Sequence, residues 1–257
     1  MSTRRPELGK WLLYKWFYRS PSFRAHLPDT RLYSDANLRD MLQRHQSVYV
    51  KPVAGSRGSL VTKVTRRDGQ SFTVHTENRA PLTVDGFASL HEHLKRHRAG
   101  RQFIVQRDVR LATIAGRPFD IRVMMQKDAS RRWQCTGICA KVAGPHSAVT
   151  NIARSRGRVL SLSDALKQSL GYGKTRCAEI ESTLRELGYK TCARLEEYQP
   201  YSEIGVDLGV SDDGQVWILE QNTGPSHALF AHLQDKQAWH LIRQTAMQRR
   251  LARGRRS

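Results

Sequence analysis

The chain has 257 residues, of which 43 are Lys or Arg and 23 are Asp or Glu, giving a formal net charge of +20. This length supports one substantial core or two closely packed lobes, which excludes a small disulfide-stapled domain. The charge favours polyanionic partners such as nucleotides, nucleic acid or anionic polymers, but it does not select among them.

The cysteines and the hydropathy pattern indicate a cellular compartment. No apolar run approaches the roughly 20 residues needed to span a bilayer, and the N-terminus lacks the features of a signal peptide. We therefore expect a cytoplasmic protein.

Cys135 and Cys139 are expected to share one face of a strand. No pair has the C-x-x-C spacing of a zinc or redox site, so we interpret the four cysteines as reduced core residues of an intracellular protein: Cys135, Cys139, Cys177 and Cys192.

Residues 10–19 form an aromatic segment with the pattern of an amphipathic helix. Such a helix can lie on a membrane surface. The simpler expectation is that its aromatic side packs against the body of the protein while Lys10, Lys15 and Arg19 are solvated. We expect residues 1–30 to form this helix and a lead-in, residues 31–235 the main domain, and residues 236–257 a helix with a frayed basic tail.

The main domain is predicted to contain alternating helices and strands, which indicates an α+β class with antiparallel sheets. Apolar spacing predicts helices at 34–43, 86–98 and 174–198, the last as one long helix or two short ones. Strands are predicted at 47–52, 60–65, 71–74, 103–106, 120–126 and 133–142.

Residues 205–222 are predicted to form a β-hairpin that brings three oxygen-bearing side chains together. If residues 211–214 form the loop, Asp207 faces Ile218, and Glu220 and Asn222 lie on the same sheet face as Asp207. Diagonal cross-strand neighbours are roughly 7–8 Å apart, a span that one or two Mg²⁺ ions can bridge.

Not every acidic residue of this hairpin is expected to be functional. Asp212 and Asp213 lie at its tip, where the simple interpretation is that they are solvated. Glu220 follows a continuous apolar run, where an unpaired carboxylate would be costly to bury, so we expect it to have a metal or cationic partner.

Two further segments could bind a nucleotide. Lys51 precedes a loop, Gly55–Gly58, whose backbone N–H groups and Ser56 hydroxyl could approach phosphate, although a turn between strands explains the same residues. Asp120 and Arg122 lie on one face of an apolar strand, which is compatible with contacts to ribose and phosphate or with an internal ion pair.

His93 and His97 stand one helical turn apart, a spacing that can bind metal, but a solvated helix face is the favoured interpretation.

The order of these features resembles the ATP-grasp superfamily, and more closely its YheC/YheD branch, the endospore coat-associated group. The resemblance runs from about residue 8 to about residue 230. The matching segments are Leu27–Thr30, Tyr49–Gly58, Val105–Asp108, Pro118–Arg122, Val149–Arg154, Gly205–Gly209 and Val216–Asn222.

The resemblance implies an ATP-grasp fold in which two α+β lobes with antiparallel sheets clamp ATP. The nucleotide-clamp lobe would cover about 47–105 and the metal-binding lobe about 106–230. Asp207, Glu220 and Asn222 would hold Mg²⁺, as one or two ions, and Mn²⁺ is compatible with the same ligands. The implied nucleotide contacts are Lys51 with phosphate and the base pocket, Ser56, Arg57 and Gly58 as a phosphate lid, Gln106 beside adenine, Asp120 with ribose, Arg122 with the transferred phosphate, and Asn151 on the acceptor side.

The resemblance implies ATP-dependent activation of a carboxylate to an acyl phosphate, which an amine or thiol then attacks, with Arg122 and Lys51 as catalytic cations. The acceptor would be an unidentified, anionic molecule.

The alternative is a catalytically weak ATP-grasp protein that assembles with spore coat components. The presence of all three metal-ligand candidates favours the ligase. Little chain precedes Leu27, so the N-terminal domain that often contacts the acceptor in such ligases is expected to be missing or reduced, which favours the alternative. Nucleic-acid binding is a third hypothesis, but the chain has none of its specific motifs.

Overall fold

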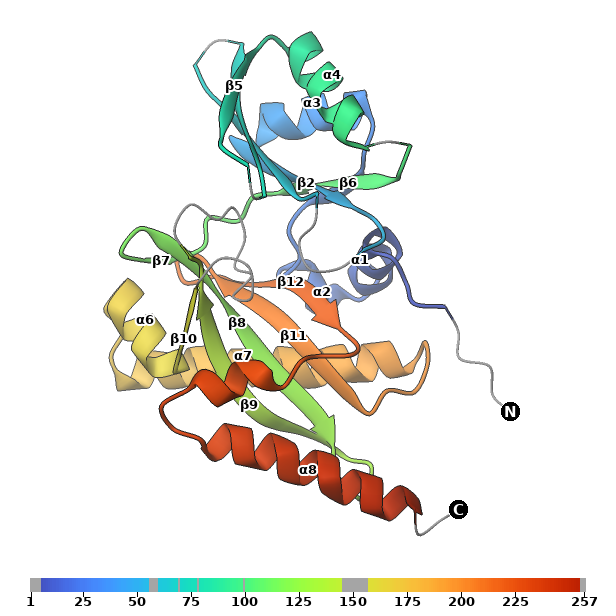
Figure 1. Cartoon of the computed structure of the whole chain (residues 1–257), viewed down its shortest axis with the longest axis vertical. Coiled ribbons are helices and arrows are strands. Elements are labelled where there is room, and N and C mark those ends of the chain that lie inside the picture. The colour runs from blue at the N-terminus through green and yellow to red at the C-terminus, as the bar shows by residue number, and fades with distance from the viewer. Residues whose placement is uncertain are drawn as a thin grey trace. The chain divides into compact units, whose positions relative to one another are not determined.

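The structure, a computed structural model, describes residues 6–55, 60–68, 70–77, 79–98, 100–144 and 157–254. The chain divides into two compact units (Figure 1). We call the described part of residues 6–109 the N-terminal unit, and residues 110–144 with 157–254 the C-terminal unit. Each unit has its own antiparallel sheet with helices packed against it, so the expected α+β class is confirmed.

The sheet of the N-terminal unit has the strand order β1-β6-β2-β3-β4-β5, and each neighbouring pair is antiparallel. The elements of this unit are α1 (Lys10–Tyr18), α2 (Pro21–Arg24), β1 (Thr30–Leu32), α3 (Asp35–Arg44), β2 (Ser47–Pro52), β3 (Thr62–Arg66), β4 (Ser71–Thr76), β5 (Leu82–Asp85), α4 (Phe87–Arg98) and β6 (Phe103–Arg107).

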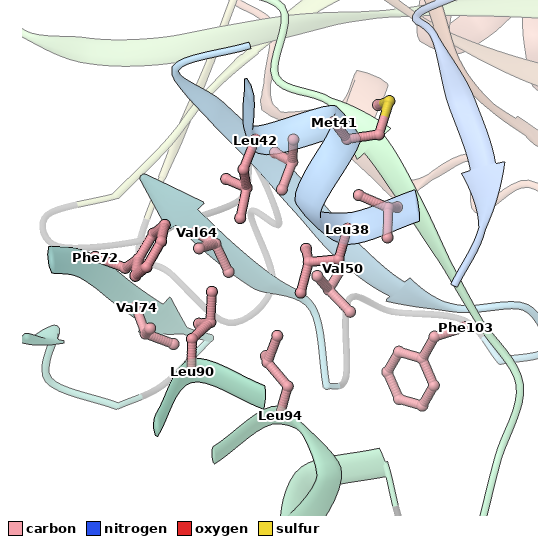
Figure 2. Close-up of a cluster of buried hydrophobic side chains, with 12 residues drawn as sticks. Leu38, Met41, Leu42, Val50, Val64, Phe72, Val74, Leu90, Leu94 and Phe103 are labelled. Carbon is pink, nitrogen blue, oxygen red and sulfur yellow. The ribbon is translucent and has the colours of Figure 1, made fainter. Parts of the chain in front are cut away.

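The core of this unit follows from the alternation of side chains along its strands. In β2, Val48 and Val50 are buried on one sheet face, whereas Tyr49 and Lys51 project from the other. Helices α3 and α4 place leucines and a methionine against the apolar face (Figure 2). The opposite face therefore carries the polar side chains. The buried cluster comprises Leu38, Met41, Leu42, Val48, Val50, Val64, Phe72, Val74, Leu90, Leu94, Phe103 and Val105.

Helix α1 packs its aromatic side inward, as expected: Phe17 is fully buried and meets Phe23 of α2 edge to face at 4.8 Å. Lys10 is partly exposed, and it also hydrogen-bonds to the chain that follows β2. Its Nζ donates to the carbonyl oxygen of Gly55 at 2.8 Å, and its backbone N–H donates to Val53 at 2.9 Å. No described helix is both long and apolar enough to cross a membrane.

The sheet of the C-terminal unit has the order β10-β9-β8-β11-β12, with the short strand β7 also paired to β8. The long helix predicted near residues 174–198 is a single helix, α7. The elements of this unit are β7 (Thr113–Ile114), β8 (Arg117–Lys127), β9 (Trp133–Val142), β10 (Arg158–Leu160), α6 (Leu162–Leu170), α7 (Lys174–Glu196), β11 (Glu203–Val210), β12 (Val216–Asn222), η1 (Ala228–His232) and α8 (Gln237–Gly254).

Different helices cover the two faces of this second sheet (Figure 1). On one face, Gly188 of α7 lies against Val123 and Met125 of β8. On the other face, Met124 and Cys139 pack with Phe230, Leu233 and Ile242 from the segment that contains η1 and α8. The polar residues Arg122 and Asp120 share this second face with Met124 because they alternate along β8.

A β-bulge in β9 overturns one expectation. Met124 pairs with Gly137, but the next residue, Met125, pairs with Cys135, so Thr136 is an additional residue in β9. The bulge places Cys135 on the α7 face and Cys139 on the α8 face, so the expectation that they share a face was wrong. All four cysteines are free thiols.

The predicted helices and strands of the main domain are confirmed to within a few residues, but the short elements β1, β5, β7, β10 and η1 and the longer helix α6 were missed. Strand β5 is short and largely exposed, so it lacks a clear alternation. Helix α6 carried a readable signal, because Ser161 caps it by accepting from the Asp164 backbone N–H, and Gly171 ends it in a left-handed conformation (φ 66°).

Helix α8 is attached to the sheet through a carboxylate of β11. Glu203 accepts from Arg249 Nη2 at 2.9 Å and from Gln126 Nε2 at 3.2 Å, and His227 Nε2 lies 3.2 Å from the same carboxylate oxygen as Arg249. Burial would raise the pKa of Glu203, but the hydrogen bonds from Arg249 and Gln126 outweigh this effect and lower it.

The α8 face requires a glycine at position 137. A Cβ there would lie 2.7 Å from the Phe230 ring and 3.2 Å from Ile242. We expect Gly137→Ala to lower the free energy of unfolding by about 1–3 kcal/mol, because the packed ring must move. Gly224→Ala is the control, since its Cβ would meet nothing within 4 Å. Chemical denaturation measures both, and equal effects would contradict the packing described.

The Glu203 contacts predict a pH-dependent contribution to stability. A lowered pKa in the folded state means that the ionised Glu203 stabilises the fold above its unfolded pKa, and that this contribution is lost as the pH falls through the folded pKa. Glu203→Gln should therefore lower Tm at pH 7, and the difference from wild type should shrink below about pH 4. The exposed Glu197→Gln is the control. A pH-independent difference in thermal melts would refute the assignment.

Candidate functional site

The hairpin of β11 and β12 brings Asp207 and Glu220 together, although by a different register from the one predicted. The loop extends through Gln215, so Leu208 faces Ile218, one residue away from the predicted pairing. A bulge at Leu219 then adds a second residue, and Asp207 faces Glu220 directly. The predicted register was wrong, but two single-residue shifts restore the alternation, so the convergence stands.

Asp207 lies at the centre of a buried polar cluster. Its Oδ1 accepts from Arg122 Nε at 2.6 Å and from Lys141 Nζ at 3.0 Å. Its Oδ2 accepts from Arg122 Nη2 at 2.9 Å and from Asn222 Nδ2 at 2.9 Å. Both carboxylate oxygens are therefore engaged, by side chains from three neighbouring strands: β8, β9 and β12.

Lys141 is a member of this cluster that the sequence interpretation missed. Its Nζ lies 2.8 Å from Asp120 Oδ1 as well as 3.0 Å from Asp207, and it faces Asp120 across β8 and β9. The proposed internal pair between Asp120 and Arg122 is not formed, because Arg122 pairs with Asp207 and Asp120 with Lys141. The sequence did carry a signal for Lys141, because a lysine within an apolar strand needs a buried partner.

The cluster has balanced charge and little access to water. Asp120 and Asp207 are each 5% exposed, and Arg122 and Lys141 are each 7% exposed. Burial would raise the pKa of Asp207, but the Lys141 ammonium and the Arg122 guanidinium outweigh it and hold that pKa well below its usual range. The two carboxylates in turn raise the pKa of Lys141 against the effect of burial. Asp207 and Lys141 are thus both charged at neutral pH.

The backbone of β11 leaves room for the Arg122 side chain. A Cβ at Gly205 would lie 3.1 Å from both Cδ and Nη1 of Arg122 and 2.8 Å from Pro225. A larger residue at this position would force the guanidinium away from Asp207. The glycine two residues before Asp207 is therefore needed for the bidentate ion pair.

The donor atoms present fit a hard divalent cation. Carboxylate and amide oxygens from Asp207, Glu220 and Asn222 are the ligands that Mg²⁺ prefers, and Mg²⁺ is often held by few protein ligands together with substrate phosphates. Among the described residues, no group of three or more His, Cys, Asp or Glu side chains could hold a metal. A metal here would have to displace one of the groups that hold the Asp207 carboxylate.

Aspartates at the hairpin tip do not belong to this cluster. Asp213 holds the turn, since its carboxylate accepts from the Ser211 hydroxyl and from the Gln215 backbone N–H. Asp212 is exposed, as expected.

The polar face of the N-terminal sheet contains a second set of candidate residues. Lys51 Nζ donates to Gln106 Oε1 at 2.7 Å, and Gln106 Nε2 donates to Thr30 Oγ1 at 3.0 Å. Lys51 also lies over the Tyr49 ring at 5.0 Å. The structure thus brings Lys51 and Gln106 together on one face, through side chains from β2, β6 and β1.

Several other predicted residues are placed differently or are not described. His93 and His97 stack at 4.4 Å, but Arg79 Nη1 lies 2.7 Å from His97 Nε2, so a cationic side chain occupies the ring nitrogen that a metal would need. Four predicted nucleotide or acceptor contacts lie outside the described residues: Ser56, Arg57, Gly58 and Asn151.

Comparison with known proteins gives relatives over most of this chain. Endospore coat-associated protein YheD of Bacillus subtilis (strain 168) is 26% identical over 233 residues, which cover 87% of this chain and 49% of YheD. Endospore coat-associated protein YheC of the same strain is 21% identical over 223 residues, covering 84% of this chain and 59% of YheC. The chain therefore spans about half the length of these relatives.

Solved structures share the fold at low sequence identity. The C-terminal domain of K. lactis Pby1, described as an ATP-grasp enzyme, superposes with a TM-score of 0.54 at 16% identity, covering 93% of this chain and 71% of that one. The ATP-grasp ligase PsnB, solved with a minimal precursor, Mg and ADP, gives a TM-score of 0.52 at 10% identity, covering 95% and 59%. These similarities confirm the expected ATP-grasp fold.

A comparison with models of protein families supports the resemblance that the sequence motifs suggested. The model of the YheC/D-like ATP-grasp family matches residues 3–250, which include both sheets and the Asp207 cluster. The chain belongs to the YheC/D-like ATP-grasp family.

Proposed function

We propose that the protein binds ATP with Mg²⁺ and acts as an ATP-dependent carboxylate–amine or carboxylate–thiol ligase through an acyl phosphate, on an unidentified, anionic acceptor. The observation that supports this most is the buried cluster around Asp207. It combines two carboxylates and an amide, the ligand types of Mg²⁺, with two cations that suit phosphate. Such a combination is typical of phosphoryl-transfer sites.

Each residue has a role that its chemistry supports. Arg122 would contact the transferred phosphate, for which its planar guanidinium can donate two parallel hydrogen bonds. Asp120 would accept from ribose hydroxyls. Asp207, Glu220 and Asn222 would hold one or two Mg²⁺ ions, and Mn²⁺ has compatible ligands. When bound, the metal would offset negative charge on the phosphates.

The N-terminal unit would supply contacts to the nucleotide. Lys51 would contact phosphate, acting with Arg122 as a catalytic cation, and Gln106 would lie beside the base. The hydrogen bond from Lys51 to Gln106 supports this proposal, since it holds the ammonium in one position on the polar face of the sheet.

A second candidate function is assembly with spore coat components, with little or no catalysis. The names of the two relatives, both endospore coat-associated proteins, favour it. The net charge of +20 would suit an anionic partner. The two functions differ in whether nucleotide turnover is needed.

Asp207 is expected to be needed for folding as well as for function. Asp207→Asn would leave Arg122 and Lys141 buried with one carboxylate fewer, and should lower the free energy of unfolding by about 3–5 kcal/mol. Asp212→Asn, in the same hairpin but exposed, should change it by less than about 0.5 kcal/mol. Urea denaturation compares the two, and a mild effect of Asp207→Asn would show that the ion pairs do not contribute as described.

Glu220→Gln is the sharper test of function, because Glu220 is only half-buried, whereas Asp207 is buried and pairs with both Arg122 and Lys141. Calorimetry should show Mg²⁺-dependent ATP binding by the wild type, and the variant should bind roughly tenfold to hundredfold more weakly while keeping its Tm. Asp212→Asn is the matched control and should bind as wild type does.

The two ways in which this experiment can fail have different meanings. Unchanged Mg²⁺-dependent binding by Glu220→Gln would show that the metal ligands are wrongly assigned. The absence of ATP binding by the wild type would reject the ligase proposal and favour the assembly function.

A further inference from the structure

The Asp207 cluster already contains its own counter-ions. Two cations, Arg122 and Lys141, balance two carboxylates, Asp120 and Asp207, and all four side chains are at most 9% exposed. Taken together, these four described side chains are therefore neutral.

We propose that Lys141 is a built-in substitute for the metal: its ammonium neutralises Asp207 when no metal is present, so that a divalent cation enters only together with the phosphates of the nucleotide. This inference deepens the proposed ATP site and rests on it.

The charge balance explains why a free cation is excluded. Adding a divalent ion to these four balanced side chains would leave uncompensated positive charge in a place with little access to water, which is costly. Nucleotide phosphates supply the missing negative charge. The metal is therefore stabilised as a metal–nucleotide complex and not as a free ion.

Distances indicate which cation must move. Lys141 Nζ lies 3.0 Å from Asp207 Oδ1, whereas Mg²⁺ binds oxygen at roughly 2.0–2.1 Å, so ammonium and metal would compete for the same oxygen. Arg122 engages both oxygens of Asp207 and lies against Gly205, so it is held more firmly than Lys141.

A lysine suits this role because it has a compact charge on a flexible stem. When Lys141 leaves Asp207 it keeps a counter-ion, since Asp120 Oδ1 already lies 2.8 Å from its Nζ. The exchange therefore does not strand a buried ammonium.

The test measures binding of Mn²⁺ alone, through the electron paramagnetic resonance signal of the free ion, to the full chain. Wild type should bind Mn²⁺ weakly without nucleotide and tightly with a non-hydrolysable ATP analogue. Lys141→Met should bind Mn²⁺ without nucleotide roughly 10- to 1000-fold more tightly than wild type, because a unit positive charge near the ligand is removed. Lys167→Met removes a charge from an exposed position on α6 and should behave as wild type.

A double variant checks that charge is the cause. Lys141→Met with Asp120→Asn removes the cation and its second partner together, which restores the local balance. Its affinity for free Mn²⁺ should fall from that of Lys141→Met toward the wild-type value, and the gain that remains measures the competition for Asp207 Oδ1. If Lys141→Met does not fold by circular dichroism, Lys141→Gln replaces it, with the same expectation.

The results separate this inference from the proposed function. Tight binding of free Mn²⁺ by the wild type, or no gain in the folded Lys141 variant, would overturn the counter-ion role even if the ATP analogue binds. A gain in the Lys141 variant together with no nucleotide binding by any protein would support the counter-ion but reject the ATP site.

Discussion

A buried carboxylate must be paired, and the pairing of Asp207 determines how four strands of the C-terminal unit meet. Arg122 of β8 faces Asp207 of β11 directly, Lys141 of β9 reaches it from the next strand, and Asn222 of β12 reaches it from the other side. A shift of one residue in any of these strands would move a partner to the opposite sheet face and leave a charge without compensation. The ion pairs therefore stabilise one register against its neighbours.

The same sheet face meets a second requirement, for space. Gly205 allows Arg122 to lie against the backbone of β11, and Gly137 allows Phe230 to lie against β9. Gly205 thus leaves space for a side chain in the polar half of the face, and Gly137 leaves space in the apolar half, which η1 and α8 cover. Larger residues at these points would push the covering side chains away from the sheet, so the ion pairs and the packing of Phe230 each depend on the absence of a Cβ.

The sequence predicted the elements whose side chains repeat regularly, such as β2, β9 and α7, because alternation and helical spacing are local. It could not predict the bulges at Thr136 and Leu219, since an additional residue in a strand leaves no mark on composition and depends on the pairing partner. Asp207 and Arg122 are 85 positions apart, so their pairing is also a tertiary property. Lys141, by contrast, was detectable by the reasoning applied to Asp120.

Both units hold their candidate phosphate-binding cations in internal contacts. Lys51 donates to Gln106, and Arg122 and Lys141 pair with Asp207. A phosphate that binds these groups must exchange one set of partners for another, so much of the attraction between phosphate and cation would be offset by the contacts that are lost. The net favourable free energy of binding must then come from the additional contacts that only a nucleotide with its metal can make. Under the proposed function, the charge of a lone phosphate or a lone cation would be insufficient at either set of residues, and this requirement would favour the metal–nucleotide complex.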